Sequence, residues 1–462
     1  MRGALAFAVM FGVASAQCQT PPARQRLNPC EADRPGLKCG SLKVFEDRAA
    51  ARGRTLDLHF AVAPADIPRA RVAVFVLAGG PGEGSISLSG SADGWLRPLR
   101  ATSDLVFVDQ RGTGESNALM CPSSAAADPA SAFGHVFNPA AVARCQTLLN
   151  QNADLAKYTT DDAAEDLDAV RAALGYDRIA IYGASYGTRL AQAYMRRFPS
   201  RVRSAVLDGV VPFDNVVPLT YAASAQNSLA RVFAACAQTP ECHAIHPDLG
   251  ADFDRLLHRF DRGSIVTAVA VGTTTPTVRM NRGDFGYAVR GILYGANAAL
   301  RLPDMIARAA GSGDLSEFAT YYWSREVVMD REIAFGLHLS VFCSEDIPFA
   351  SDKDIATATA GTFLGRYLFD EYREACADWP RGYLAADARA PVTVRVPTLL
   401  VSGAFDPVTP PAFADRVARS LPIVRPITAP RGSHGSATGC PRAAVLYVLD
   451  HGTLDGLPAV CR

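Results

Sequence analysis

A short segment, IAIYGASYGTRLAQAY at residues 179–194, joins an apolar run to a helical pattern through one tight turn. Gly183 and Gly187 flank Ser185 in that turn, and glycines leave the space that a sharp change from strand to helix needs. Glycine and serine also recur in ordinary turns, so this pattern alone is weak evidence of chemistry. The segment nevertheless predicts a buried strand, a tight turn that holds Ser185, and a helix.

Other apolar runs repeat this arrangement. Residues 71–77 (RVAVFVL) end in a glycine-rich stretch, and so do residues 104–109 (DLVFVD). Between the second run and the serine, residues 159–176 carry an N-cap, an acidic first turn, one apolar face, and Gly175 as a stop. Strands that alternate with helices indicate an α/β fold with a mostly parallel sheet flanked by helices.

The middle of the chain has a different character. From 213 to 390, helical patterns rich in alanine, leucine and arginine dominate, and the alternation returns at 396–411 (VPTLLVSGAFDPVTPP). The chain has 462 residues, of which 49% are hydrophobic, so it exceeds the usual size of a single domain. We therefore expect a core formed by 17–212 and 391–462, and an inserted helical cap domain at 213–390.

Residues 1–16 have the pattern of an export signal. A positive charge precedes an apolar stretch at 4–13, and small residues follow as a cleavage site. The stretch is about half the ~20 residues of a membrane-spanning helix, so we expect no stable membrane insertion. The sequence predicts a secreted or periplasmic protein that starts near Gln17. Lipid attachment at Cys18 is the alternative, but Gln17 is not the small residue that normally precedes a lipidated cysteine.

Export makes the eleven cysteines readable as disulfides, because such bonds persist in oxidising compartments. Short loops close most easily, and proximity leaves only Cys18 over. The predicted pairs are Cys30 with Cys39, Cys121 with Cys145, Cys236 with Cys242, Cys343 with Cys376, and Cys440 with Cys461. The spacing of Cys236, Cys242, His243 and His246 resembles a metal site, but export favours a small disulfide loop there. We expect no metal and no other cofactor.

The charge balance limits the class of partner. Lysine plus arginine and aspartate plus glutamate number 46 each, and the sequence contains no basic run. Nucleic-acid binding requires a basic patch or stripe, so we expect no nucleic-acid partner.

Two later positions suit a catalytic role with Ser185. A serine hydroxyl is a poor nucleophile at neutral pH, so it needs a base within hydrogen-bond reach and a third group that orients the base. Asp406 ends the apolar run TLLVSGAF, and His434 lies in the loop PRGSHGS after the next run. A turn aspartate and a loop histidine are the alternatives, but the order Ser, Asp, His at strand ends favours a triad.

A negatively charged oxygen on the substrate would need backbone donors. The amide of Tyr186, directly after Ser185 at the start of the helix, is one candidate. The glycine-rich loop LAGGPGEGS supplies the second, because glycines let the backbone approach a substrate closely, and we assign it to Gly80. An ordinary strand exit is the alternative for this loop.

Three motifs together resemble one known family. They are GGPG at 79–82, DQRGTGES at 109–116 and GASYGT at 183–188. The chain resembles the prolyl- and tripeptidyl-aminopeptidase branch of α/β-hydrolases, which are serine peptidases that act at a free N-terminus. LDGVVP, CSED, SGAFDPVTP and GSHGS extend the likeness over nearly the whole mature chain. Ala78 replaces the histidine usual before GGPG in prolyl aminopeptidases, which favours the secreted tripeptidyl-like branch.

The resemblance implies an α/β-hydrolase fold, a triad of Ser185, Asp406 and His434, and a cap that closes over the site. It also implies peptide substrates whose ammonium group is held by cap carboxylates, for which Glu345 is the first candidate and Asp346 the second. A solvated charge beside a disulfide is the alternative role for Glu345.

Other functions remain open at this point. A carboxylesterase or lipase on the same fold is the main alternative, because fold alone does not decide function. A non-catalytic binding protein would require a broken triad, and all three residues are present. Epoxide hydrolases and dehalogenases need an aspartate where this chain has Ser185.

Overall fold

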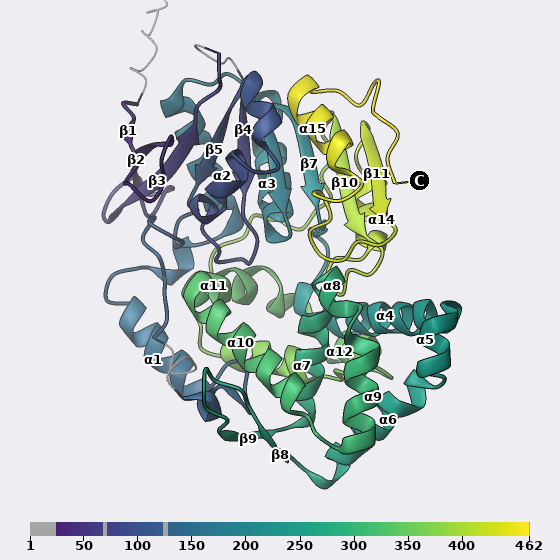
Figure 1. Cartoon of the computed structure of the whole chain (residues 1–462). Coiled ribbons are helices and arrows are strands. Elements are labelled where there is room, and N and C mark those ends of the chain that lie inside the picture. The colour runs from purple at the N-terminus through teal and green to yellow at the C-terminus, as the bar shows by residue number, and fades with distance from the viewer. Residues whose placement is uncertain (1–24, 68–71, 123–127, 462) are drawn as a thin grey trace, which may run out of the picture.

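The computed structural model describes residues 25–67, 72–122 and 128–461, so the expected export signal and Cys18 lie outside the described residues. Within these ranges, the chain forms two layers, a sheet with its flanking helices above and a layer of helices below (Figure 1). The strands of the nine-stranded sheet follow one another across it in the order β1 (Asn28–Pro29), β2 (Lys38–Phe45), β3 (Thr55–Ala63), β5 (Ser103–Val108), β4 (Val72–Leu77), β6 (Ile179–Ala184), β7 (Val202–Asp208), β10 (Thr398–Gly403) and β11 (Val424–Ala429).

The sheet is mostly parallel, as predicted. Strands β4, β5, β6, β7, β10 and β11 pair in parallel. The antiparallel strands β1, β2 and β3 extend one edge, with β3 joined to β5. The described part of the first predicted run thus forms β4, and most of the run at 104–109 lies in β5, its neighbour in the middle of the sheet.

Helices cover both faces of the sheet, because successive side chains of each strand point to opposite sides. In β4, Phe75 packs into one buried cluster, while Val74 and Val76 pack into the other. The first face is covered by α2 (Thr160–Leu174), α3 (Tyr186–Arg197) and α14 (Pro411–Ala418). The second is covered by α15 (Arg442–His451) and the short helices η1 (Ser85–Ala92) and η2 (Arg97–Ala101).

Helix α2 shows how local sequence sets these elements. The Thr159 side chain accepts a hydrogen bond from the Asp162 amide at its start, and Gly175 ends it in the left-handed conformation with φ of 74°. Both the N-cap and the glycine that ends the helix agree with the sequence prediction.

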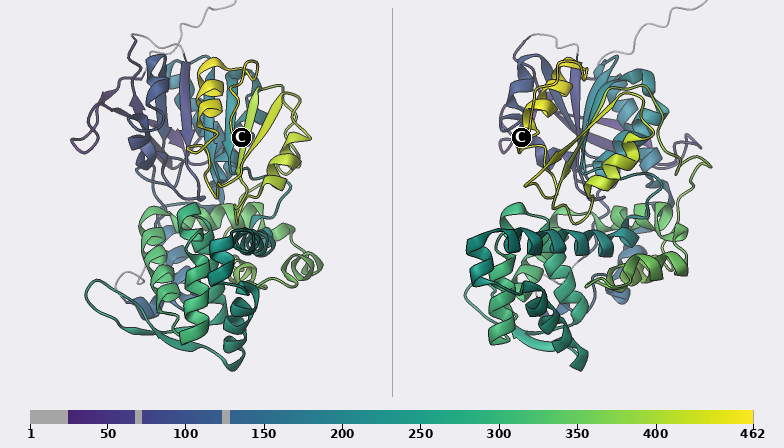
Figure 2. Two further views of the ribbon diagram at one scale, coloured as in Figure 1. Left: turned by 45° about the vertical axis from the view of Figure 1, so that its right-hand side comes forward. Right: turned by 90° about the vertical axis from the view of Figure 1, so that its right-hand side faces the viewer.

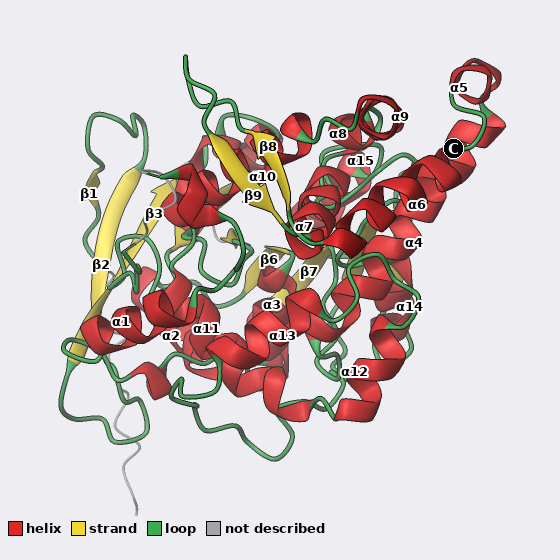
Figure 3. Cartoon of the chain, turned by 90° about the horizontal axis from the view of Figure 1, so that it is seen from below, coloured by secondary structure: helices red, strands yellow, loops and turns green. Residues whose placement is uncertain are grey.

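The lower layer is a helical insertion between β7 and β10, which we call the cap. Figure 2 shows it as a layer of helices beneath the sheet, and in Figure 3, which is seen from below, these helices lie in front of the strands. Its helices are α4 (Val217–Gln238), α5 (Pro240–Ile245), α6 (Leu249–Arg259), α7 (Arg282–Leu293), α8 (Ala296–Ala299), α9 (Leu302–Ser312), α10 (Ser316–Glu332), α11 (Phe335–Glu345), α12 (Asp352–Thr359) and α13 (Tyr367–Ala375). A hairpin of β8 (Ile265–Ala268) and β9 (Thr277–Met280) accompanies them.

Helix α1 (Pro139–Leu149) adds to the cap layer, although it precedes β6 in the chain. It contacts α11 and α13. The sequence analysis placed this segment in the core, so the lower layer draws on more of the chain than the insertion alone.

Five disulfides join the cysteines in the pairs that the sequence predicts. Cys236 and Cys242 are bonded to each other, which removes both thiolates from the alternative metal site. In the ranges that the structure describes, no helix combines the length and the apolar content that a membrane span requires.

Candidate active site

Ser185 lies at a strained turn between β6 and α3. Its backbone has φ of 53° and ψ of −122°, a conformation that non-glycine residues rarely adopt and that is concentrated at functional sites. A Cβ on Gly183 would come within 2.4 Å of the Gly187 carbonyl oxygen, and one on Gly187 within 2.5 Å of the Leu77 carbonyl oxygen. The two flanking glycines are therefore required by the close packing of this turn.

Asp406 and His434 form a direct pair. His434 Nδ1 lies 2.9 Å from Asp406 Oδ2. Asp406 is 2% exposed, and its Oδ1 accepts hydrogen bonds of 2.8 Å from the amides of Val408 and Thr409. The Thr409 hydroxyl donates to Asp406 Oδ2 at 2.7 Å. These donors hold the carboxylate in place, so it fixes the His434 ring and leaves Nε2 available as a base.

The pair shifts the pKa of both members. Burial raises the pKa of Asp406, but His434 and the bonds from Thr409 lower it more, so the net pKa lies below its ordinary value. Burial lowers the pKa of His434, but the Asp406 carboxylate raises it more, so the net pKa lies above its ordinary value of 6.5. Asp406 is thus an anion that stabilises the imidazolium form of His434.

Ser185 and the histidine pair follow strands that lie on opposite sides of β7. Ser185 follows β6, and Asp406 and His434 follow β10 and β11 on the far side of β7. Ser185 and Thr409 line the same small pocket. The Thr409 hydroxyl oxygen lies 3.1 Å from His434 Nδ1. Among the described residues, no hydrogen bond joins Ser185 to His434. The structure therefore brings the three predicted residues to the carboxyl ends of the parallel strands, and two of them are in contact.

The glycine-rich loop after β4 lies beside Ser185. Gly80 has φ of 104°, and a Cβ there would come within 2.6 Å of the Gly82 amide nitrogen. Gly80 and Tyr186, the two predicted backbone donors, line the same pocket as Ser185. The Tyr186 hydroxyl is buried and lies 2.9 Å from the Thr160 hydroxyl.

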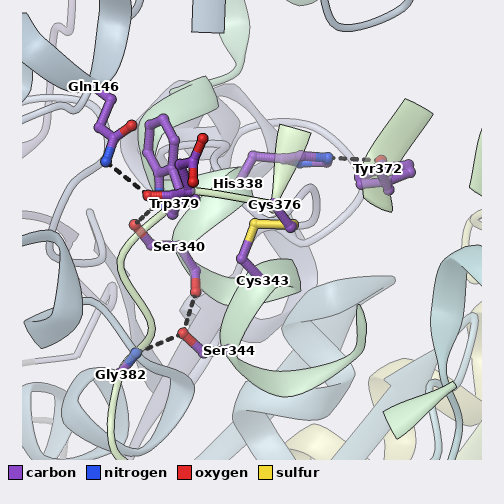
Figure 4. Close-up of a disulfide and its surroundings, with 10 residues drawn as sticks. Gln146, His338, Ser340, Cys343, Ser344, Tyr372, Cys376, Trp379 and Gly382 are labelled. Atoms are coloured by element: carbon purple, nitrogen blue, oxygen red, sulfur yellow. Dashed lines mark hydrogen bonds between the residues drawn. A yellow bond between two sulfur atoms is a disulfide. The ribbon is translucent and has the colours of Figure 1, made fainter. Parts of the chain in front are cut away.

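His338, on cap helix α11, holds this loop from the cap side. Its Nδ1 donates to the Pro81 carbonyl oxygen at 2.8 Å, and its Nε2 accepts from the Tyr372 hydroxyl at 2.8 Å. Burial lowers the pKa of His338 to about 4, which keeps the ring neutral. Figure 4 shows the Cys343–Cys376 disulfide that joins α11 to the end of α13 beside this pair.

The DQRGTGES segment supports the same region from the core. The Asp109 carboxylate accepts hydrogen bonds from the amides of Ile86 (2.8 Å) and Glu115 (2.9 Å). Arg111 donates from Nε and Nη2 to the two carboxylate oxygens of Asp166, at 2.6 and 2.8 Å. Both residues thus brace loops of the core.

Glu345 and Asp346, the predicted ammonium ligands, are bonded to other residues. Asp346 is 0% exposed and pairs through both oxygens with Arg189 at 2.7 and 3.1 Å. Glu345 is 7% exposed and accepts from the amide and hydroxyl of Thr160, both at 2.7 Å. Burial raises the pKa of Glu345 to about 7, although Arg189 and Thr160 lower it. Neither residue lines the pocket of Ser185.

Glu83 is a carboxyl group that sequence reasoning missed. One of its oxygens accepts a hydrogen bond of 3.2 Å from the Gly79 amide. A Cβ on Gly79 would lie 3.2 Å from Ser185 Cβ and 3.6 Å from that Glu83 oxygen. Burial raises the pKa of Glu83, and the nearby Glu332 carboxylate raises it further, although the hydrogen bond from the Gly79 amide lowers it. Within the described ranges, Glu83 has no cationic partner.

Asp208 is a second residue that the sequence analysis passed over. It ends β7, and its two oxygens accept from the amides of Ser436 (3.0 Å) and Ala437 (2.9 Å) in the His434 loop. The motif LDGVVP carried this signal, because an aspartate that ends a buried strand needs donors from a neighbouring loop.

A serine on a strained strand-to-helix turn, a histidine paired with a buried aspartate and a glycine-rich loop beside the serine are features of serine hydrolases. The chain belongs to the alpha/beta hydrolase fold family, whose pattern matches residues 72–436.

Among the relatives, the chain is 29% identical over 425 residues to serine protease Hip1 of Mycobacterium tuberculosis, which covers 83% of this chain and 80% of that protein. It is 33% identical over 147 residues to tripeptidyl aminopeptidase of Streptomyces lividans, covering 29% of this chain and 27% of that protein. The crystal structure of proline iminopeptidase from Mycobacterium smegmatis aligns with a TM-score of 0.44 and 16% identity, covering 89% of this chain and 98% of that one.

Proposed function

We propose that this chain is an exported serine aminopeptidase that hydrolyses peptide bonds near the free N-terminus of peptides. The observation that carries the proposal is the pair of His434 and Asp406 at the strand ends where Ser185 occupies its strained turn, on the side of the core that faces the cap. The relatives named serine protease and tripeptidyl aminopeptidase support peptide bonds as the substrate class. The five disulfides support export.

The proposed reaction proceeds through an acyl-enzyme. Ser185 Oγ attacks the scissile carbonyl carbon while His434 Nε2 takes the hydroxyl proton, and Asp406 stabilises the imidazolium. The carbonyl electron pair moves to oxygen, where the amides of Tyr186 and Gly80 stabilise the negative charge. The intermediate collapses, His434 protonates the leaving amine, and the C–N bond breaks. Water, deprotonated by His434, then hydrolyses the Ser185 ester and restores the enzyme.

An aminopeptidase needs a group that recognises the substrate ammonium. We assign this role to Glu83 first, because its carboxyl group bonds to the amide of Gly79, whose backbone packs against Ser185, and has no cationic partner in the described chain. An ammonium ion bound there would form a charge-assisted hydrogen bond and offset the cost of burying the carboxylate. Glu345 is the second candidate, since a ligand would have to compete with Thr160 for it. Asp346 ranks last because Arg189 occupies both of its oxygens.

The test uses chromogenic anilides of single amino acids and of tripeptides, each with a free and with an acetylated N-terminus, beside a short p-nitrophenyl ester. We expect cleavage of the free-amine anilides only, and complete loss in Ser185→Ala. The preferred length then separates the tripeptidyl from the single-residue type. If the enzyme hydrolyses the ester but none of the anilides, the peptidase proposal is wrong and a carboxylesterase or lipase takes its place.

Matched variants locate the ammonium site. Glu83→Gln keeps the shape of the side chain and removes its charge, so it should reduce the preference for free over acetylated substrates at least about tenfold. Glu345→Gln serves as the comparison. A loss of preference in Glu345→Gln alone would move the ammonium site from Glu83 to the cap.

A further inference from the structure

The C-terminal end of cap helix α7 meets the His434 loop directly. The Ser433 hydroxyl donates to the Leu293 carbonyl oxygen at 2.5 Å. The next cap residue, Tyr294, packs edge-on against the His434 ring, with 5.1 Å between ring centroids and 68° between planes. Tyr294 is thus held beside the side chain that would protonate the leaving group.

Tyr294 also faces the proposed substrate. It lines the same pocket as Ser185, together with Tyr221 and Phe342 from the cap and Thr409 from the core. Tyr294 is half-buried, so part of it remains accessible.

The hydroxyl of Tyr294 has a proton to donate. Arg290 Nη2 donates a hydrogen bond of 2.8 Å to this oxygen. A guanidinium has only donors, so the tyrosine oxygen must act as the acceptor in this contact. Among the described residues, no acceptor lies within hydrogen-bond distance of the Tyr294 hydroxyl. Its proton therefore remains available to a molecule in the pocket.

Arg290 strengthens this donor. It is 3% exposed, its Nε has no hydrogen-bond partner, and it forms no ion pair with any carboxylate of the described chain. It lies instead over the rings of Tyr221 and Tyr294, 4.0 and 5.0 Å from their centroids. Arg325 lies 4.5 Å from the Tyr294 centroid. A cation that bonds to the oxygen polarises the hydroxyl and makes it a better donor in a site of low dielectric constant.

We propose that Tyr294 determines specificity on the leaving-group side, where its hydroxyl donates a hydrogen bond to the carbonyl oxygen of the residue that follows the scissile bond. This inference rests on the proposed peptidase function. A peptide leaving group carries that carbonyl, whereas an anilide leaving group does not. Tyr294 keeps its own proton throughout, and His434 remains the group that protonates the leaving nitrogen.

The test compares two substrates that share the acyl group that the wild-type enzyme cleaves best. One ends in alanine amide and the other in p-nitroaniline, and Tyr294→Phe keeps the ring against His434 while it removes the hydroxyl. We expect kcat/KM to fall about tenfold for the peptide and less than about twofold for the anilide. The anilide rate shows in the same sample that the variant is folded.

Tyr287→Phe is the matched control. Tyr287 lies on the same helix, with its ring centroid 6.0 Å from the Arg290 guanidinium, but it does not line the pocket. We expect it to leave the ratio of the two rates unchanged. If Tyr294→Phe lowers kcat/KM equally for both substrates, or for neither, the assignment is wrong. If the wild-type enzyme cleaves neither substrate, the proposed peptidase function itself fails.

Discussion

Arg111 in the core and Arg290 in the cap are both buried, but their charges are balanced in different ways. Arg111 is 0% exposed and bonded to both oxygens of Asp166 and to the carbonyl oxygens of Glu46 and Lys157. Arg290 is packed among tyrosine rings and has no carboxylate partner in the described chain. Arg111 is thus neutralised by a carboxylate where it lies, whereas Arg290 is a buried cation without such a partner and is bonded to Tyr294 at the pocket.

The pair of Asp406 and His434 offers the largest test of charge pairing in the core. Asp406→Asn should lower kcat by about 10⁴-fold, because the amide no longer stabilises the imidazolium or its tautomer. The pKa of His434 lies above its ordinary value of 6.5. The neutral ring, which acts as the base, is therefore lost as the pH falls through that raised pKa. Without the carboxylate that pKa falls, so the acid limb of the kcat profile moves to lower pH.

Rates of both proteins between pH 5 and 9 provide the measurement. Circular dichroism at each pH serves as the control for folding. An acid limb at the same pH in both proteins would show that another group controls the rate.

The next largest effect concerns Asp166. Asp166→Asn should lower the free energy of unfolding by about 3–5 kcal/mol, because it leaves the Arg111 cation buried without a negative partner. Asp57→Asn is the control, since Asp57 pairs with Lys43 at the exposed surface, where such pairs are worth about 0–1 kcal/mol. Urea unfolding followed by circular dichroism measures both. Similar losses in the two variants would refute the distinction between buried and exposed pairs.

A smaller effect than that of Asp166→Asn is expected in the cap. Arg290→Met should lower the free energy of unfolding by only about 1–2 kcal/mol, because it removes cation–π contacts but leaves no unpaired carboxylate behind. The same urea titration applies. A loss as large as that of Asp166→Asn would mean that Arg290 is a structural residue first, like Arg111.

Much of the core was predictable from local patterns. The apolar runs became β4, β5 and β6, the glycines around Ser185 formed the tight turn, and Asp406 and His434 came into contact at the strand ends. The antiparallel strands β2 and β3 were not foreseen, because they lack a glycine-rich exit or a following helix. Pattern and spacing therefore predict the parallel strands of the sheet better than the antiparallel strands at its edge.

The cap was less predictable at the level of single contacts. The partner of Asp346 is Arg189, more than 150 residues away in the sequence, and nothing local to CSED indicates that pair. Nothing in the sequence distinguishes His338 from the other histidines of the insertion, yet it bonds to the Pro81 carbonyl in the loop that lines the pocket of Ser185. Such contacts depend on how the insertion packs on the core, which is a tertiary property.

The order of the disulfides has a consequence for how the chain can mature. Each of the five bonds joins cysteines that follow one another directly in the sequence, from Cys30 and Cys39 to Cys440 and Cys461. When such a chain crosses a membrane from its N-terminus onward, the second cysteine of every pair emerges before the first of the next. Each loop can then be oxidised in turn, and the native pairing needs little reshuffling by an isomerase.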